Sequence, residues 1–496
     1  MEGDAHTGAM QPSLPATFEH RKRRLRDLSA AAEADQELAL RERWNRRELL
    51  QFQKHRLNAL VRHAVRRSPF YRELYQGVQL EPDVRLDMLP VITKDLVLQN
   101  FDRLVTDPRL RSDALDRYVR AKEEPEHYLE TFHILQTAGS SGRRGIFVFD
   151  CVEWGVVLAS WLRCRRFMGE RSQSGPGTRF ASVAGNAPFH TTYRMAASLD
   201  IGIPRPLRLD ATASLPEMVS ALNAFRPEMV MLYPSMVPIL ATEQVAGRLL
   251  IHPSAIVTAG EWRTPEAVAI ILEAWGVKPF NDYAMTEGPV GMDCGCHRGI
   301  HVFEDLSIVE VVDSKNRPVP AGSRGDKILF TNLFNYTQPL IRYEVSDLVR
   351  ASSEPCPCGR PFSLIEAVEG RLDDVLYLKG VNGKTLPIHP HHFVEAIKGL
   401  AGETRYQVIE QDDGIEILVE RAGRVGPTDA LGRSILASVR TALEAAGVEC
   451  PPLRLRFVTD LEGHPQLAGK FKTVYSLRSR ALRPRVSRPV ETTRPG

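Results

Sequence analysis

The chain has 496 residues but no apolar run near the ~18 residues that a membrane-spanning helix needs. It also lacks the charged-then-apolar N-terminal pattern of a secretory signal. Seven cysteines, an odd and small number for this length, argue against a secreted scaffold held by disulfides. A net charge of +3 gives little general attraction to nucleic acid or membranes. We therefore expect a cytoplasmic protein with reduced thiols that binds neither nucleic acid nor membranes.

Core-forming residues are scarce at both ends of the chain, where positive charge collects. Arg21–Arg26 and Arg478–Arg488 are basic and polar. Such segments cannot bury enough apolar surface to fold, so we expect disordered tails over residues 1–35 and 477–496. A nucleic-acid-binding arm is the alternative, but no aromatic pattern supports it.

Between these ends the composition is that of a globular protein, with 43% hydrophobic and 25% charged residues. From residue 151 onward, helical patterns alternate with short apolar strands. The helical patterns cover Cys151–Met168, Leu215–Phe225, Met236–Gly247 and Thr264–Trp275. The strand patterns cover Phe180–Ala184, Met229–Tyr233 and Ser254–Thr258. This alternation predicts parallel βαβ units.

The pattern changes further along the chain. Short strands are predicted at Ser307–Val312, Gly325–Thr331 and Leu340–Tyr343. After a break at Gly370–Asp374, strands at 406–409, 415–419 and 453–458 surround a helix at 431–446. We therefore predict an α/β protein with a large N-terminal domain (βαβ units plus a β-rich part) and a small α+β C-terminal domain.

A glycine- and serine-rich loop, Thr137–Gly145, lies between two apolar strand patterns. Glycines let backbone N–H groups approach an anion, hydroxyls add donors, and Arg143 and Arg144 add positive charge. Such a loop suits a polyphosphate, although it lacks the lysine pattern of a Walker A loop. An ordinary hairpin turn is the alternative interpretation.

Polar residues follow several of the predicted strands. Because ligands of open parallel sheets bind beyond the carboxyl ends of the strands, we expect three such groups to lie together. They are Tyr233-Pro234-Ser235, Gly260-Glu261 and Tyr283–Glu287.

Five stretches in a fixed order resemble the motifs of adenylate-forming (acyl-CoA synthetase-like) enzymes: Thr137–Gly145, Asp282–Glu287, Ile341–Asp347, Gly370–Asp374 and Ala468–Phe471. Four more are similar to the phenylacetate–CoA ligase-like branch: Leu89–Lys94, Tyr233-Pro234-Ser235, Gly299–His301 with Glu304-Asp305, and Cys356–Arg360. The ordered set spans about residues 44–476.

This resemblance implies an N-terminal adenylation domain over residues 36–370 and a mobile C-terminal lid domain over 371–476. It implies an AMP-forming acid–thiol ligase, which joins an aromatic or small carboxylic acid to AMP from ATP and then transfers the acyl group to CoA. The alternatives are an amine or a carrier protein as acceptor, and an inactive relative that only binds nucleotide. Mg²⁺ is the expected cofactor, and a homodimer is one expected assembly.

The resemblance also implies roles for individual residues. The β,γ-phosphates would bind Thr137, Ser140, Ser141 and Gly142, and adenine would bind near Gly260, Glu261, Asp282 and Tyr283. Asp347 would bind the ribose with Arg371 beside it, Thr286 the α-phosphate, and Glu287 Mg²⁺. Asp373 would be the hinge and Lys470 the catalytic lysine.

The residue types suit these roles, although each has an ordinary alternative. A lysine is a mobile point charge for phosphate and carboxylate, and a carboxylate accepts two bonds from neighbouring hydroxyls. Equally, Asp347 suits a turn, Glu287 suits a helix N-terminus, and Lys470 suits a solvated surface. The chain departs from the family pattern at Arg144-Gly145 and Ser141 in the loop, and at Ala284 and Ser346, which add bulk near the acyl and ribose pockets.

Two short groups of cysteine and histidine indicate a zinc site. Cys294-Gly295-Cys296-His297 with His301 precedes Cys356-Pro357-Cys358 by about sixty residues. By resemblance to zinc-carrying members of the branch, the expected structural-zinc ligands are Cys294, His301, Cys356 and Cys358. Cys296 and His297 are competing ligands, and scattered reduced thiols are the alternative without metal.

Overall fold

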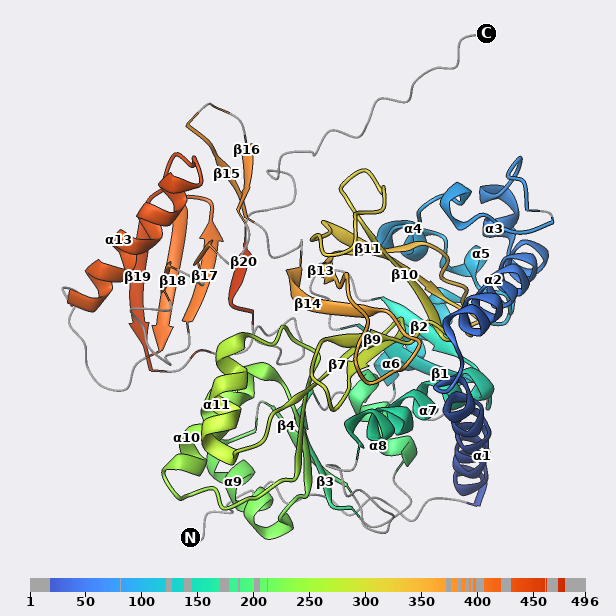
Figure 1. Ribbon diagram of the computed structural model, residues 1–496, viewed down its shortest axis with the longest axis horizontal. Helices are drawn as coiled ribbons and strands as arrows, with labels where there is room; N and C mark the ends of the chain where they lie inside the picture. The colour runs from blue at the N-terminus through green and yellow to red at the C-terminus, as the bar shows by residue number, and fades with distance from the viewer. Residues whose placement is uncertain are drawn as a thin grey trace.

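The computed structural model describes residues 18–80, 82–121, 127–137, 145–169, 178–185, 188–199, 206–211, 213–371, 376–381, 383, 385–388, 392–393, 396–397, 406–420, 430–459, 461 and 472–477. Buried hydrophobic residues form a large core between residues 31 and 364 and a separate core between residues 376 and 474. Figure 1 shows the corresponding large body and smaller unit. Over these described ranges no helix is both long and apolar enough to cross a membrane. The predicted domain boundary stays a prediction, because residues 372–375, with the expected hinge Asp373, lie outside the described residues.

A nine-stranded sheet forms the centre of the large body, in the order β13-β14-β9-β8-β7-β6-β5-β3-β4. Five neighbouring strands are parallel: β4 (Leu207–Asp210), β3 (Phe180–Ala184), β5 (Met229–Leu232), β6 (Ala255–Ala259) and β7 (Phe280–Met285). The other four are antiparallel to their neighbours: β8 (Gly288–Asp293), β9 (Ile300–Val302), β14 (Leu364–Arg371) and β13 (Asp347–Ala351). The sheet therefore changes from parallel to antiparallel between β7 and β8.

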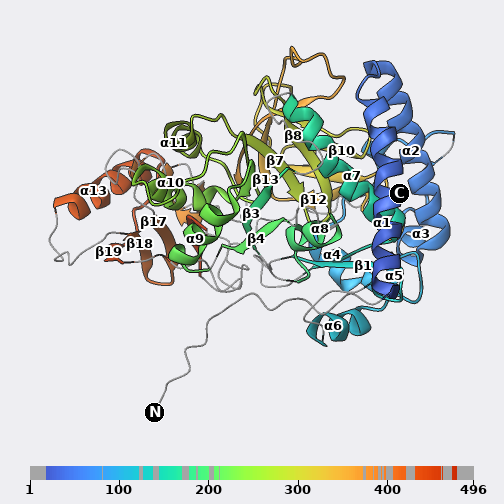
Figure 2. The ribbon, with the colours of Figure 1, turned by 90° about the horizontal axis from the view of Figure 1, so that it is seen from below.

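Helices connect the parallel strands and cover both of their faces. On one side lie α9 (Leu215–Phe225), α10 (Val237–Val245) and α11 (Pro265–Trp275), and on the other lie α7 (Cys151–Met168) and α8 (Thr191–Leu199) (Figures 1 and 2). Coverage on both faces explains why these strands are continuous apolar runs in the sequence. The predicted bounds of α7, β3 and α9 are confirmed.

Local signals explain where these helices begin and end. At the start of α7, the Asp150 side chain accepts hydrogen bonds from the backbone N–H groups of Val152 and Glu153, and the Glu153 side chain accepts one from Asp150 N. At α11, Thr264 accepts from Ala267 N, and the helix stops at Gly276 with a left-handed φ of 67°.

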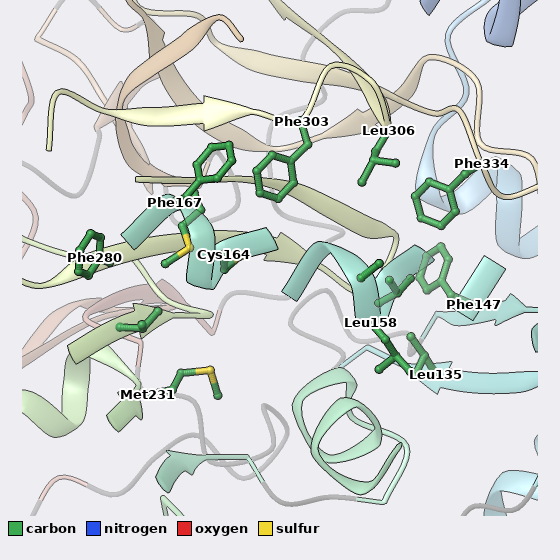
Figure 3. Packing of buried hydrophobic residues seen from close by; sticks show 14 of the residues in the cluster. Leu135, Phe147, Leu158, Cys164, Phe167, Met231, Phe280, Phe303, Leu306 and Phe334 are labelled. Carbon is green, nitrogen blue, oxygen red and sulfur yellow. The ribbon is translucent and has the colours of Figure 1, made fainter. Parts of the chain in front are cut away.

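Part of the large core lies between α7 and the large sheet (Figure 3). Leu158, Cys164 and Phe167 point from α7 into this core. The ring of Phe167 meets the ring of Phe303 edge-on, with centroids 5.5 Å apart. Burying each such side chain contributes about 1.5–3 kcal/mol, so α7 and the sheet stabilise one another.

Smaller elements surround the large sheet. One antiparallel hairpin pairs β1 (His133–Gln136) with β2 (Ile146–Phe149), and a three-stranded sheet holds β10 (Ser307–Val312), β11 (Lys327–Asn332) and β12 (Tyr343–Val345). The N-terminal helices are α1 (Phe18–Arg41), α2 (Arg46–Arg67), α3 (Pro69–Leu74), α4 (Lys94–Gln99), α5 (Phe101–Leu104) and α6 (Ser112–Ala121).

The smaller unit is an α+β arrangement. Its four-stranded sheet has the order β19 (Leu453–Val458), β18 (Gly414–Glu420), β17 (Tyr406–Gln411) and β20 (Val474–Ser476), with α13 (Ala430–Ala445) packed against it. A hairpin of β15 (Leu376–Lys379) and β16 (Thr385–Ile388) lies beside it. The predicted α/β class, with a large parallel-containing sheet and a small α+β unit, is confirmed.

The expected disordered tail over residues 1–35 is wrong from Phe18 onward. α1 lies along α7, and Ala31 and Leu38 are only 2% and 1% exposed. The two helices approach closely at Gly155, where a Cβ atom would lie 2.6 Å from the Cβ of Ala30. Small residues allow two helices to approach most closely, but alanines give only a weak apolar pattern in a sequence. The prediction missed α1 because it did not recognise this alanine pattern.

The strand predicted at Leu340–Tyr343 is also displaced, because β12 covers Tyr343–Val345. Arg342 has a left-handed φ of 51°, which interrupts an extended strand at this point. Its guanidinium is held by Glu310, with two nitrogen–oxygen distances of 3.0 Å, and this buried ion pair fixes the bend.

A buried polar network fastens α1 to the hairpin strand β1. Asp27 Oδ2 lies 2.8 Å from His127 Nε2 and 3.1 Å from His133 Nε2. Arg194 Nη2 lies 2.6 Å from His133 Nδ1. A guanidinium can only donate, so His133 Nδ1 accepts and its proton is on Nε2, facing Asp27. With its proton on Nε2, His133 has no lone pair there for a metal ion, and Asp27, His127, His133 and Arg194 form one polar network.

We predict that this network makes the fold sensitive to acid. Burial lowers the pKa of His133 to about 3 in the folded protein. Between about pH 6.5 and about pH 3, the histidine therefore binds a proton in the unfolded chain but not in the folded one. The free energy of unfolding therefore decreases as the pH is lowered, by up to about 1.4 kcal/mol per pH unit. His133→Asn should lose less stability than the parent between about pH 7 and about pH 5.5, measured by urea unfolding. The exposed His252→Asn is the matched control, and equal losses in all three proteins would contradict the prediction.

Candidate functional site

The site is built around the turn where the sheet reverses. β7 ends at Met285 and β8 begins at Gly288, so Thr286 and Glu287 form the turn between them. Gly288 has φ +150°, and a Cβ atom there would lie 2.8 Å from Asn332 Nδ2. Thr286 and Glu287 therefore lie at the carboxyl end of the last parallel strand, which is the edge where ligands of such sheets bind.

Glu287 is held from the neighbouring three-stranded sheet. Tyr343 Oη donates to Glu287 Oε1 at 3.1 Å, and Asn332 Nδ2 donates to the Glu287 carbonyl at 2.9 Å. Both the carboxylate and the backbone of Glu287 thus have defined directions. An oriented carboxylate oxygen at this edge is a suitable ligand for a hard cation such as Mg²⁺.

Asp347 is brought to the same region by β13. Tyr283 Oη donates to Asp347 Oδ2 at 2.6 Å, and Asp347 is only 3% exposed. Across β13 and β14, the backbone of Asp347 is paired with that of Arg371, whose side chain lies outside the described residues. Tyr283 and Asp347, far apart in the sequence, thus lie together here.

The ends of β5, β6 and β7 meet beside this pair. Ser235 N donates to Glu261 Oε2 at 2.9 Å, which ties the end of β5 to the end of β6. Gly260 has φ +78°, and a Cβ atom there would lie 2.8 Å from the ring of Tyr233. Asp282 pairs with Ala259 across β6 and β7, and burial raises the pKa of Asp282 to about 7.

Thr137 and Gly145, the two ends of the loop predicted to bind phosphate, adjoin β1 and β2 of the hairpin. Thr137 N donates to the Gly145 carbonyl at 3.0 Å, and Gly145 N donates to Thr137 Oγ1 at 2.8 Å, so the base of the loop is closed. A hairpin was common to both interpretations of this stretch. Residues 138–144 lie outside the described residues, with Ser140, Ser141 and Gly142 among them, and so does Lys470.

Four cysteine and histidine side chains form a compact cluster. The ligand atoms of Cys294, His301, Cys356 and Cys358 all lie within 4.8 Å of one another. Cys294 Sγ is 3.6 Å from Cys356 Sγ, and Cys358 Sγ is 3.4 Å from His301 Nε2. Zinc–sulfur bonds of about 2.3 Å in a tetrahedron separate two sulfurs by about 3.8 Å, so this donor set fits zinc.

The two competing ligands lie outside this cluster. Cys296 is exposed, and the imidazole of His297 packs at a tilt against the ring of Phe280, with centroids 4.7 Å apart. Antiparallel pairing of β8 with β9 brings Cys294 and His301 together, because one follows β8 and the other lies in β9. Of the alternatives left open by the sequence, this geometry favours Cys294 and His301.

Charged groups connect α7 with the segments that follow His301 and Cys358. Arg163, fully buried, makes two bonds to Asp305 at 2.8 and 2.7 Å. Arg360 lies over the Phe167 ring at 4.3 Å. Asn332, Tyr343 and Arg163 carry no individual signal in the sequence, because each acts through a partner that is distant in the sequence.

Comparisons with known proteins agree with this architecture. No protein-family model matches the chain. A crystal structure of 2-hydroxyisobutyryl-CoA ligase in the postadenylation state, in complex with R3-HIB-AMP, matches with a TM-score of 0.65 and 20% identity, over 86% of this chain and 89% of that one. An open conformation of the same ligase, with 2-HIB-AMP and CoA, matches with a TM-score of 0.56 and 20% identity, over 86% and 91%. The fold is therefore that of an adenylate-forming CoA ligase.

Two curated relatives are phenylacetate-coenzyme A ligases. The protein of Thermus thermophilus is 27% identical over 391 residues, which are 74% of this chain and 80% of that protein. The protein of Escherichia coli is 23% identical over 359 residues, which are 68% and 74%. The resemblance stated from the motifs is confirmed: the chain has phenylacetate-coenzyme A ligases as homologues.

We predict that Gly260 cannot be replaced without moving Tyr233. Gly260→Ala meets both a left-handed φ and the Tyr233 ring, whereas Gly276→Ala meets only a left-handed φ of 67°, with nothing within 4 Å. Gly276→Ala should therefore cost about 1 kcal/mol in the free energy of unfolding, and Gly260→Ala clearly more. Urea unfolding of both variants checks this, and equal costs would show that the contact with Tyr233 is not a constraint.

Proposed function

We propose that the chain is an ATP-dependent ligase that activates a carboxylic acid as acyl-AMP and transfers the acyl group to CoA. The observation that carries the proposal is the meeting of Glu287, Tyr283 and Asp347 at the reversal of the sheet. The fold shared with a ligase that is seen with an acyl-AMP, and the phenylacetate-coenzyme A ligase homologues, support it.

In the first step the acid's carboxylate oxygen forms a bond to the α-phosphorus of ATP, and the bond to the β-phosphate oxygen breaks, releasing pyrophosphate. Such a step needs positioning and charge neutralisation more than covalent help. In our proposal Thr286 contacts the α-phosphate, and Glu287, directed by Tyr343, would hold Mg²⁺. Bound Mg²⁺ neutralises phosphate charge.

The nucleoside has its own proposed partners. Asp347 would accept hydrogen bonds from the ribose hydroxyls while the Tyr283 hydroxyl orients its carboxylate. The loop Gly260-Glu261 and Asp282 would contact adenine. With a pKa of about 7, the Asp282 carboxyl can donate or accept near neutral pH, which suits a base edge that carries both kinds of group.

Other roles in the proposal rest on the resemblance. Thr137 with Ser140, Ser141 and Gly142 would hold the β,γ-phosphates, Arg371 would lie beside the ribose, Asp373 would be the hinge and Lys470 the catalytic lysine. The acid would be aromatic or small. Location in the cytoplasm and a homodimer also remain predictions, as does the choice of CoA over an amine or a carrier protein.

We also propose that Cys294, His301, Cys356 and Cys358 hold one structural zinc. Four protein ligands fill a tetrahedral site and leave no position for a substrate. The cluster follows the active-site strands β7 and β8, so its role would be to keep β8, β9 and the segment with Cys356 together.

The purified protein should catalyse ATP–pyrophosphate exchange that depends on one class of acid and needs no CoA. Asp347→Asn should reduce the exchange by about 10²-fold or more and Lys470→Ala at least as strongly, because each removes a charge that acts on ATP. Asp116→Asn, at an exposed position of α6, should match the parent. Unchanged exchange in Asp347→Asn would contradict the assigned site, and stoichiometric acyl-CoA formation without a carrier would exclude the alternative acceptors.

The protein as purified should contain about one zinc per chain. Cys356→Ser should lose most of this metal and show a lower thermal midpoint, while Cys450→Ser, outside the cluster, should retain both. Elemental analysis and thermal unfolding with and without a chelator measure these effects. Equal metal content in the two variants would show that the cluster is not the binding site.

A further inference from the structure

Three buried amide side chains, at a spacing of three residues, lie at the end of β11 and in the segment that leads to β12. Asn332, Asn335 and Gln338 are 0%, 2% and 0% exposed, and we call them the amide ladder. Burying an amide is costly unless its donors and acceptors are satisfied, so the partners of these groups show what they do.

At one end of the amide ladder, the side chains make hydrogen bonds to the backbone of the hairpin strand β2. Val148 N donates to Gln338 Oε1 at 2.8 Å, and Gln338 Nε2 donates to the Ile146 carbonyl at 3.2 Å. Asn335 Nδ2 donates to the Val148 carbonyl at 2.9 Å. β2 pairs with β1 in a two-stranded sheet. The two amides therefore act on its other edge as a neighbouring strand would.

The other end of the amide ladder reaches the turn of the candidate site. Asn332 Nδ2 donates to the Glu287 carbonyl at 2.9 Å. Asn332 Oδ1 accepts from Asn335 N at 3.0 Å, and Asn335 Oδ1 accepts from Gln338 N at 2.7 Å. Each amide thus fixes the turn that places the next one, and a continuous series of hydrogen bonds joins Glu287 to β2.

A buried carboxyl group holds the ladder from the side of α7. Glu153 Oε1 accepts from Tyr336 N at 2.7 Å and from Thr337 N at 2.8 Å, and Glu153 Oε2 accepts from Asp150 N at 2.8 Å. The segment between Asn335 and Gln338 is therefore tied to the start of α7 as well as to the hairpin.

We propose that Gln338 is a positioning residue for adenylate formation. Through β2 it sets the position of the hairpin base at Thr137 and Gly145 relative to Glu287, and the ladder keeps these two parts of the site in one rigid frame. The inference rests on the proposed function. Attack on the α-phosphate needs both parts to be aligned, and a displacement of about 1 Å can cost about 10²-fold in rate. Transfer of an acyl group from a preformed adenylate depends less on the position of the hairpin.

The test measures the two half-reactions separately in the full-length protein. Gln338→Met keeps the size of the side chain but removes both bonds to β2. We expect it to lower the kcat of acid-dependent ATP–pyrophosphate exchange by about 10–100-fold, with the KM for the acid changed less than about 3-fold. Acyl-CoA formation from the synthetic acyl-adenylate should stay within about 3-fold of the parent.

Gln53→Met is the matched control, because the Gln53 amide also donates to a backbone carbonyl, that of Glu304 at 3.0 Å, away from the hairpin. Gln53→Met should catalyse ATP–pyrophosphate exchange with the same kcat as the parent. Equal losses in both half-reactions of Gln338→Met, or the same loss in Gln53→Met, would overturn the positioning role. A parent protein without exchange would instead contradict the proposed function.

Gln338→Glu gives an independent test if Gln338→Met folds poorly. A buried neutral carboxyl group can donate to the Ile146 carbonyl and accept from Val148 N as the amide does, whereas an ionised one cannot donate. We expect exchange by this variant to approach that of the parent near about pH 6 and to fall at least about 10-fold relative to it by about pH 8. A constant ratio across this range would contradict the inference.

Discussion

The change from parallel to antiparallel pairing between β7 and β8 determines where the candidate site lies. Here the change is made by a tight turn, and Thr286 and Glu287 form that turn. β8 and β9 then pair so closely that a Cβ atom at Gly291 would lie 2.1 Å from the His301 carbonyl. The same pairing that follows the turn thus brings Cys294 to His301, so the turn of the site and the cysteine cluster depend on the same strands.

Around this turn the chain uses hydrogen bonds from distant segments instead of local ones. Tyr343 and Asn332 come from the three-stranded sheet, and Asp347 comes from the outermost strand of the large sheet. Such partners align a site only if the core between them is rigid. The packing of α7 against the strands, with Phe167 and Phe303 in contact, supplies that rigidity (Figure 3).

Much of this arrangement could be predicted from local sequence signals. The bounds of α7 and α9 follow from apolar periodicity, and the meeting of Gly260 with Tyr233 follows from parallel strand ends. α1 was missed because its contacts use alanine against Gly155, and the break before β12 because Arg342 is held by distant Glu310. The amide ladder was missed because asparagine and glutamine in a polar stretch resemble a loop until their partners are known.

The central claim is that this site forms a mixed anhydride between the acid and AMP. The most direct measurement uses a substrate acid whose carboxylate is labelled with oxygen-18 and follows the label after turnover with ATP and CoA. Attack by the carboxylate on the α-phosphate predicts one labelled oxygen in AMP for each acyl-CoA formed. Label in inorganic phosphate with ADP as the product, or unlabelled AMP, would contradict the account.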